Sequence, residues 1–213
     1  IDLSASYCLP GLSDAHTHLS DQFDQGSYVN RLTRPPADVA LRASVFAART
    51  LLAGFTTVRD AGGNDSVDVA LRNAINRGDI IGPRMYVAGI ALSMTGGHGD
   101  ESGGYREDRV RQPGVREGVA DGVPNVIQAG RLTIKRGADH IKFMASGGVL
   151  SQADSADMPQ FTAEEMAAII QTARDHGMKV MAHAHGDEGA RRAVAAGVAS
   201  IEHGTYISAD TFA

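Results

Sequence analysis

The sequence predicts an α/β protein of the TIM type, a (β/α)8 barrel of which this chain supplies about six βα units. Short apolar strands alternate with helices along most of its 213 residues, and parallel strands need a crossover that is usually a helix. Polar residues stand repeatedly at the carboxyl ends of these strands, where a barrel gathers its active site. The competing doubly wound fold would place a GxGxxG motif directly after its first strand, and the sequence has none there.

Six strands are predicted from short apolar or β-branched runs. Most of these runs follow directly on a glycine, a proline or an acidic residue, residue types that punctuate a chain at its turns. In order, the six strands cover residues 7–15, 55–59, 84–88, 140–145, 178–182 and 198–202.

The helices between these strands are predicted from apolar residues at helical spacing and from their ends. A glycine follows each of them closely, as expected near a helix C-cap, and Thr162 precedes one of them as its N-cap. A long glycine-rich loop, of the kind that usually serves a function, covers residues 94–104. The predicted helices cover residues 39–51, 67–77, 125–135, 163–176 and 188–196.

Composition excludes several classes of protein. The chain carries 20 Lys and Arg against 25 Asp and Glu, a net charge of -5, which argues against a nucleic-acid binder. No apolar run approaches the roughly 20 residues that span a bilayer. We therefore expect a small-molecule or dipeptide substrate, with neither nucleic acid nor a membrane as partner, and we leave a homo-oligomer open.

A single cysteine, Cys8, cannot form an internal disulfide, so the fold depends on its packed core and on any metal that it binds. This composition favours a cytoplasmic location. A secreted or periplasmic location would follow if a signal peptide preceded residue 1, where the chain starts abruptly with an isoleucine and looks cut.

Eight histidines give the strongest lead, because four of them form two HxH pairs. His16 and His18 stand at the end of the first strand, where an extended backbone points both side chains the same way. Two neutral imidazoles that converge suit a borderline-soft ion such as Zn²⁺. A lone HxH pair also occurs by coincidence or for ordinary hydrogen bonding, and its place at a barrel mouth is what favours a metal.

The second pair, His183 and His185, closes the fifth strand, and His203 closes the sixth. His183 and His185 face the same side of an extended strand, so periodicity does not decide which of them is a ligand. A histidine at a strand end is more often a polar cap than a ligand. Three strands that all end in histidine make the ligand interpretation the better one.

Lys142 lies between Ile141 and Phe143 in an interior strand, where an unpaired ammonium is costly. Composition alone favours an ion pair with a carboxylate such as Asp139 or Asp60. If the strand-end histidines bind two metal ions, however, a carbamylated Lys142 would supply the bridging anion that two dications need.

Four segments, taken in order, resemble the amidohydrolase superfamily of metal-dependent barrels. Within that superfamily the chain is similar to the imidazolonepropionase-like branch, which includes Xaa-Pro and Xaa-Arg dipeptidases and ochratoxin-type amidases. The resemblance spans essentially the whole chain, and the order of its motifs makes it specific. The segments are residues 9–18, 140–148, 182–186 and 201–205.

The resemblance implies a centre of two Zn²⁺ or other divalent ions, bridged by a CO2-derived carbamate on Lys142. The intervals of 41 residues from Lys142 to His183 and of 20 from His183 to His203 match this branch if His183 is the ligand. His185 then either supports a metal ligand or contacts the substrate. An aspartate after strand eight completes the implied centre, and the metal ligands implied in this chain are His16, His18, Lys142, His183 and His203.

The implied reaction is hydrolysis of an amide or peptide C–N bond in a dipeptide or N-acyl amino acid of the Xaa-Pro or Xaa-Arg/Lys type. A hydroxide that bridges the two zinc ions would attack the carbonyl. Relatives use a histidine on the loop after strand three to contact the substrate, which makes His98 catalytic as well as substrate-binding, beside the catalytic Lys142. His185 and Tyr206 are the other expected substrate-binding residues.

The chain stops at Ala213, just past strand six, before the position of the implied aspartate. We therefore expect a fragment of a longer chain. Residues 1–9 would be a lead-in strand or the remnant of a small β-sandwich, and residues 10–213 would be the N-terminal part of the barrel, strands one to six.

Two alternatives stay open. A mononuclear hydrolase of a cyclic amide such as an imidazolone would not need Lys142, although its fifth-strand motif would more often read His-Ala-Asp. A non-catalytic, truncated metal-binding fragment is the other alternative, because six parallel strands leave two unpaired edges that a closed barrel would abolish.

Overall fold

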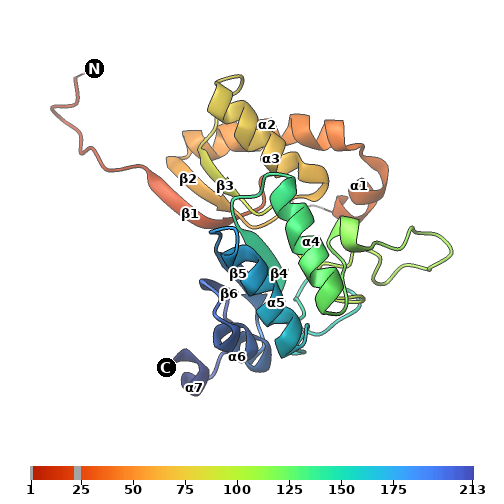
Figure 1. The fold of residues 1–213 in the computed structure, drawn as a ribbon. Coiled ribbons are helices and arrows are strands. Elements are labelled where there is room, and N and C mark those ends of the chain that lie inside the picture. The colour runs from red at the N-terminus through yellow and green to blue at the C-terminus, as the bar shows by residue number, and fades with distance from the viewer. Residues whose placement is uncertain (1, 22–24) are drawn as a thin grey trace.

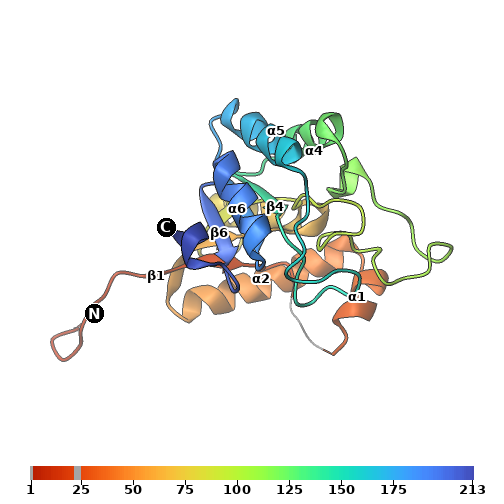
Figure 2. The same cartoon turned by 90° about the horizontal axis from the view of Figure 1, so that it is seen from below.

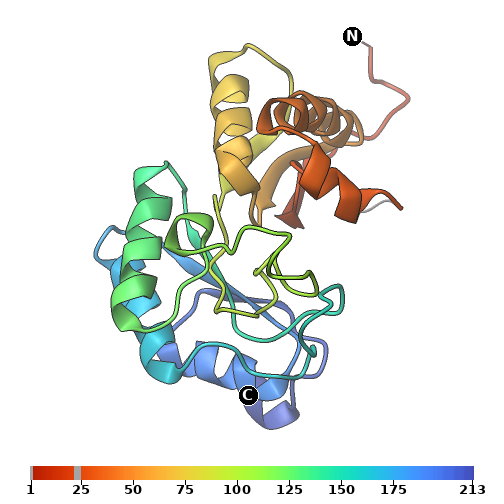
Figure 3. The ribbon, with the colours of Figure 1, turned by 90° about the vertical axis from the view of Figure 1, so that its right-hand side faces the viewer.

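The computed structural model describes residues 2–21 and 25–213. Its strands form two parallel sheets of three strands each, in the orders β1-β2-β3 and β4-β5-β6. Figure 1 and Figure 3 show that helices cover one face of each sheet. The strands are β1 (Leu12–Thr17), β2 (Phe55–Asp60), β3 (Arg84–Val87), β4 (Ile141–Met144), β5 (Val180–Ala184) and β6 (Ser200–His203).

The helices connect the strands and bury apolar side chains against them. α2 and α3 share a core with the first sheet, and α4, α5 and α6 share a core with the second. Figure 2 shows α2 and α5 on opposite sides of the molecule, with the strands between them. The helices are α1 (Ser27–Thr33), α2 (Pro36–Leu52), α3 (Val67–Arg77), α4 (Val123–Lys135), α5 (Ala163–Arg174), α6 (Asp187–Ala196) and α7 (Ala209–Phe212), with 3-10 turns at Asn64–Ser66 and Val115–Glu117.

A segment after β3 joins the two sheets. Leu92 forms a parallel bridge with Phe143 of β4. Its N–H donates to the carbonyl of Lys142 at 2.8 Å, and its carbonyl accepts from the N–H of Met144 at 2.9 Å. β1 and β6 each pair with one neighbour among the described strands. The α/β class with parallel strands is therefore confirmed, whereas closure into a barrel stays a prediction.

Several predicted elements have the expected bounds or caps. The helix predicted at residues 67–77 coincides with α3. The hydroxyl of Thr162 accepts from the N–H of Glu165 at 3.2 Å, and the carboxylate of Glu165 accepts from the N–H of Thr162 at 2.7 Å, so that Thr162 caps α5 as expected.

Other elements are shifted from their predicted positions. β1 begins at Leu12 rather than at residue 7, because it pairs only with β2 and Leu12 lies opposite Phe55, the first residue of β2. β5 begins two residues later than predicted, since the N–H of Met178 still bonds back to the carbonyl of Ala173 in α5. α1 and α7 have no counterpart among the predicted helices.

Alternation along the strands separates a helix-facing side from the side turned away from the helices, which we call the inner face. β4 and β5 are buried along their whole length, as expected where both faces of a parallel sheet are covered. Phe143 and Ala182 belong to the core shared with the helices. Lys142 and His183, their neighbours in sequence, therefore point to the inner face.

Residues 2–11 form neither a helix nor a strand and run away from the first sheet in Figure 1. They overlap the predicted lead-in segment 1–9, of which Ile1 lies outside the described residues, so a domain boundary after residue 9 stays a prediction. No helix in the described part of the chain is long and apolar enough to cross a membrane.

Candidate metal centre

Four histidines from both sheets meet at the carboxyl ends of their strands. His16 lies in β1, His18 follows it, His183 lies in β5 and His203 ends β6. The ring centroids are 5.3 Å apart for His16 and His18, 4.8 Å for His16 and His203, and 4.7 Å for His183 and His203. The structure thus brings the four predicted histidine ligands into one continuous cluster.

His203 joins this cluster through an unusual backbone conformation. Its φ is 71°, and compared with a φ near −120° in a regular parallel strand this turns the Cα–Cβ bond by about half a turn around the N–Cα bond. Regular alternation would place His203 on the helix-facing side with Ile201. The left-handed φ instead brings its ring beside His16. Such a conformation is costly for a residue other than glycine and is found most often at functional sites.

Backbone carbonyls orient the rings of His18 and His183. Nδ1 of His18 donates to the carbonyl of Gly62 at 2.9 Å, and Nε2 of His183 donates to the carbonyl of Gly147 at 3.0 Å. A carbonyl can only accept, so the second nitrogen of each neutral ring carries a lone pair. That nitrogen is Nε2 in His18 and Nδ1 in His183, and each is the atom with which the ring could bind a metal ion.

A buried carboxylate orients His16. Nδ1 of His16 donates to Oε2 of Glu202 at 2.7 Å, so Nε2 is the nitrogen with which this ring could bind a metal ion. Burial raises the pKa of Glu202, but hydrogen bonds from His16 and Ser200 and the charge of Arg59 outweigh this and lower it to about 2. Glu202 and Arg59 were not among the site residues predicted from the sequence. Each is a charged residue at an inward-facing position of its strand, β6 for Glu202 and β2 for Arg59. That pattern could have identified them.

Burial favours the neutral form of three of these rings. It lowers the pKa of His18 and of His203 to about 4, and burial together with the charge of His98 lowers the pKa of His183 to about 2. The charge of Lys142 contributes to all three shifts, so its amine lies within electrostatic range of the rings. A neutral imidazole is the form that binds a divalent metal ion.

Lys142 is buried at the inner face, with 1% of its surface exposed. Burial lowers the pKa of its amine to about 8. The alternative ion pairs are not formed: Asp139 pairs with Arg72 at 2.7 Å, and Asp60 accepts from the N–H of Leu19 at 2.7 Å. Within residues 2–21 and 25–213 the amine of Lys142 has no ion pair, so the structure leaves it available for chemistry.

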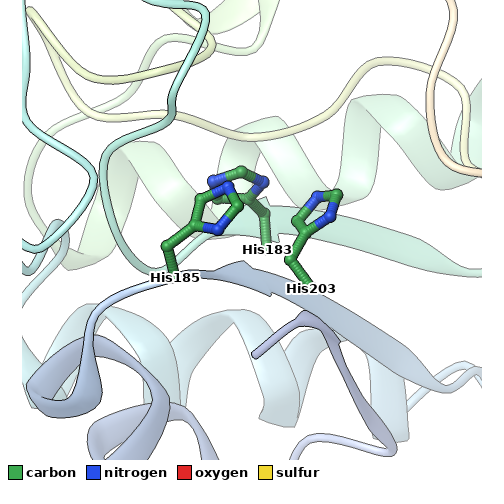
Figure 4. Close-up of side chains that lie close together, drawn as sticks. All are labelled: His183, His185 and His203. Carbon is green, nitrogen blue, oxygen red and sulfur yellow. The ribbon is translucent and has the colours of Figure 1, made fainter. Parts of the chain in front are cut away.

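His185 lies directly beside the rings of His183 and His203. Figure 4 shows His183, His185 and His203 side by side, and one nitrogen from each lies within 4.8 Å of the others, a spacing that could hold a metal ion. The rings of His185 and His203 are stacked with centroids 4.7 Å apart. Nδ1 of His185 lies 2.7 Å from the hydroxyl of Thr205, in a hydrogen bond. His185 is therefore placed either to bind a metal or to contact a substrate.

His98 rests on the ring of His183. The two rings are stacked with centroids 4.3 Å apart, and Nδ1 of His98 lies 3.1 Å from the hydroxyl of Ser151, in a hydrogen bond. Gly148 lies beside the His98 ring, so closely that an added Cβ would clash with it. A histidine from the loop after β3 thus lies against the cluster, as the sequence analysis expected.

Tyr206 lies at the edge of the cluster. Its ring centroid is 6.5 Å from that of His185, and its N–H donates to the carbonyl of His185 at 2.9 Å. More than half of its side chain is exposed. This position allows contact with a molecule that approaches the histidines from solvent.

The donor set fits a divalent metal ion, because neutral imidazoles with defined lone pairs converge beside a lysine without an ion pair. Comparison with known proteins identifies the family. Residues 7–211 match the amidohydrolase family. The ochratoxinase of Aspergillus niger is 39% identical over 210 residues, which cover 93% of this chain and 43% of that protein.

Solved structures give the same relationship. A Xaa-Pro dipeptidase with methionine bound in its active site superposes with a TM-score of 0.88 at 42% identity, over 95% of this chain and 50% of that one. A prolidase in complex with N-methylphosphonate-L-proline superposes with a TM-score of 0.83 at 37% identity, over 95% of this chain and 49% of that one. The chain spans about half the length of the relatives that it matches.

Proposed function

The chain belongs to the amidohydrolase family, and from this premise we propose that it supplies the metal centre of a hydrolase that cleaves an amide or peptide C–N bond. The observation that carries the proposal is the convergence of histidines from β1, β5 and β6 around the inner face that holds Lys142. Each of the named relatives, an ochratoxinase, a dipeptidase and a prolidase, supports the same class of substrate.

Four imidazoles and one modified lysine would hold two divalent ions, zinc or another. When bound, such ions supply a hydroxide nucleophile near neutral pH and polarise the scissile carbonyl. The lone pairs on Nε2 of His16 and His18 and on Nδ1 of His183 support this assignment, as does the left-handed φ that turns His203 inward.

Lys142 would contribute an anion. Its neutral amine attacks CO2, an N–C bond forms, and the nitrogen loses a proton to the solvent, which leaves a carbamate with two oxygens for metal ions. Burial lowers the pKa of the amine to about 8 and so increases the share of the reactive neutral form. The lack of an ion pair at Lys142 in the described part of the chain supports the same step.

Substrate would be held at the mouth of the cluster by His98, His185 and Tyr206. His98 would contact the scissile carbonyl or the substrate carboxylate from its place against His183. The substrate class that we propose is a dipeptide or N-acyl amino acid of the Xaa-Pro or Xaa-Arg/Lys type. In the whole protein, residues 10–213 would form the first six units of a barrel.

A dipeptide assay tests this proposal. The zinc-loaded full-length protein, prepared with bicarbonate, is incubated with a panel of dipeptides that carry proline, arginine, lysine or a hydrophobic residue at the C-terminal position, and the released amino acid is measured. Lys142→Ala in the same protein is the matched control. We expect release by the wild-type protein and none by the control. A zinc-loaded wild-type protein that releases no amino acid from any member of the panel would contradict the proposal.

A second candidate is a mononuclear hydrolase whose metal is held by His183, His185 and His203. The 4.8 Å limit that encloses one nitrogen from each ring favours it. The two candidates differ in the role of His185, which is a metal ligand only in the mononuclear centre. The binuclear centre should keep two zinc equivalents in His185→Ala, whereas the mononuclear centre should lose its single equivalent. Metal analysis of this variant decides between them.

A further inference from the structure

Glu202 is the one acidic side chain that bonds directly to a histidine of the cluster among the hydrogen bonds of the described residues. It lies on the inner face of β6, next in sequence to His203, with 6% of its surface exposed. Its two oxygens have different tasks. Oε2 accepts from Nδ1 of His16 at 2.7 Å, and Oε1 accepts from Arg59 at 2.7 Å and from the hydroxyl of Ser200 at 2.8 Å.

Arg59 fixes this carboxylate from β2. Its Nη2 donates to Glu202, and its Nη1 donates to the hydroxyl of Ser200 at 3.0 Å. Its Nε donates to the carbonyl of Ala15 at 2.8 Å, one residue before His16. The guanidinium therefore holds both the carboxylate and the backbone that carries the His16 ring, and it links β1, β2 and β6.

The bond to Glu202 distinguishes His16 from the other oriented rings. His18 and His183 donate to neutral backbone carbonyls, whereas His16 donates to a carboxylate. An anionic acceptor makes the opposite ring nitrogen a stronger electron donor, and such partners fix the tautomer and direction of a ligand. His16 thus differs from His18 and His183 in its supporting chemistry.

We infer that Glu202, held by Arg59, is a positioning residue that aims Nε2 of His16 and strengthens its bond to one of the two metal ions. The inference rests on the proposed metal centre. Removal of comparable supporting groups lowers metal affinity by about 10- to 100-fold. The effect falls on the ion that His16 binds and leaves the ion bound without His16 at its normal affinity.

Zinc titration of the 213-residue chain by calorimetry tests the inference with Glu202→Gln, which keeps the size of the side chain and removes its charge. We expect one of two zinc equivalents to weaken by about 10- to 100-fold and the other to keep its affinity. Glu165→Gln is the matched control, because Glu165 is also buried but caps α5, where it accepts from the N–H groups of Gly122 and Thr162. Its variant should keep both affinities.

A double-mutant cycle separates positioning from a general structural role. If Glu202 acts through His16, Glu202→Gln changes zinc affinity in the wild-type background and causes no further change in His16→Ala. Equal losses in both backgrounds would overturn the inference. Arg59→Lys keeps the charge but cannot reach Ala15 and Glu202 together, so it should weaken binding of the same zinc ion. This variant provides the test if Glu202→Gln does not fold.

The outcomes also distinguish this inference from the proposed function. A wild-type chain that binds no zinc would contradict the proposed metal centre itself. A wild-type chain that binds two equivalents, with a Glu202→Gln variant of unchanged affinities and unchanged melting temperature, would overturn only the role of Glu202.

Discussion

The imidazole rings of His16 and His203 lie 4.8 Å apart, although one residue comes from the first strand of the first sheet and the other from the last strand of the second. A metal ion bound by both residues would tie the two sheets together. Folding and metal binding should therefore be coupled, because the site does not exist when the sheets separate.

The first prediction is that zinc stabilises the chain. At a free zinc concentration of about 100 times the dissociation constant, binding adds about 2.7 kcal/mol to the free energy of unfolding, which for a chain of this size raises Tm by about 5–10 °C. Thermal melts with zinc and with a chelator measure the difference. His203→Ala should lose most of it, and a wild-type Tm that does not respond to zinc would contradict the coupling.

The second prediction is that, in the metal-free chain, the buried amine of Lys142 destabilises the folded state. Burial lowers the pKa of its amine from 10.5 to about 8, which at pH 7 corresponds to a penalty of about 3 kcal/mol for the protonated amine in the folded state. Lys142→Met removes the amine at similar size. We expect the variant to be more stable than the wild type in metal-free, CO2-depleted buffer, yet unable to bind two zinc ions.

The pH dependence gives this prediction a sign. The folded state has the lower pKa, so the penalty is complete below pH 8 and disappears as the pH rises toward 10.5. Denaturant unfolding should show the difference in free energy of unfolding between Lys142→Met and the wild type shrinking as the pH rises from 8 to 10.5. If the difference between the two chains does not change with pH, Lys142 is not charged in a buried site.

The third prediction concerns the space that Gly148 leaves for His98. A Cβ at residue 148 would lie 2.0 Å from the His98 ring, so Gly148→Ala must displace the ring. We expect zinc content to stay at the wild-type level and kcat/KM for the best dipeptide to fall by about 10- to 100-fold. In the control Gly114→Ala, an added Cβ meets its nearest atom only at 4.0 Å. A Gly148→Ala rate equal to the control would contradict a substrate role for His98.

Short-range sequence patterns were enough to predict the candidate metal ligands. They were not enough to predict the residues and the backbone conformation that orient those ligands. The HxH spacing of His16 and His18, and the strand-end places of His183 and His203, follow from residues that are close in sequence. The partner of Glu202 is different: Arg59 lies 143 positions away, and no periodicity relates the two. The left-handed φ of His203 likewise could not be predicted, because a positive φ is uncommon for any residue other than glycine and here depends on tertiary packing.

The same limit applies to the fold. Alternating strands and helices predicted the parallel sheets, because crossover connections determine strand direction. They did not predict the start of β1, which depends on where β2 begins to pair with it. Periodicity also did not decide which histidine of the second HxH pair is the ligand, because His183 and His185 face the same side of an extended strand.

The fourth prediction concerns His140, whose Nε2 is buried without a hydrogen-bond partner among the described residues. Burial, with a further contribution from the charge of Arg59, lowers the pKa of His140 from 6.5 to about 4. The unfolded chain therefore binds a proton at residue 140 between these values, and the wild type loses stability as the pH falls below 6.5.

His140→Leu removes both the unpaired nitrogen and this proton uptake. We expect the variant to be more stable than the wild type, with an advantage that grows by about 1 kcal/mol between pH 7.5 and pH 5.5. Urea unfolding at the two pH values measures it. An advantage that stays constant, or that shrinks in acid, would show that His140 is protonated in the folded chain.

The proposed metal centre depends on Lys142, which would become a carbamate and supply oxygen ligands to two metal ions. Carbon NMR of the zinc-loaded chain prepared with 13C-bicarbonate, together with its zinc content, measures this modification. We expect a carbamate signal that is absent from Lys142→Ala and two zinc ions per wild-type chain. Two bound zinc ions with an unmodified Lys142 amine would contradict this expectation.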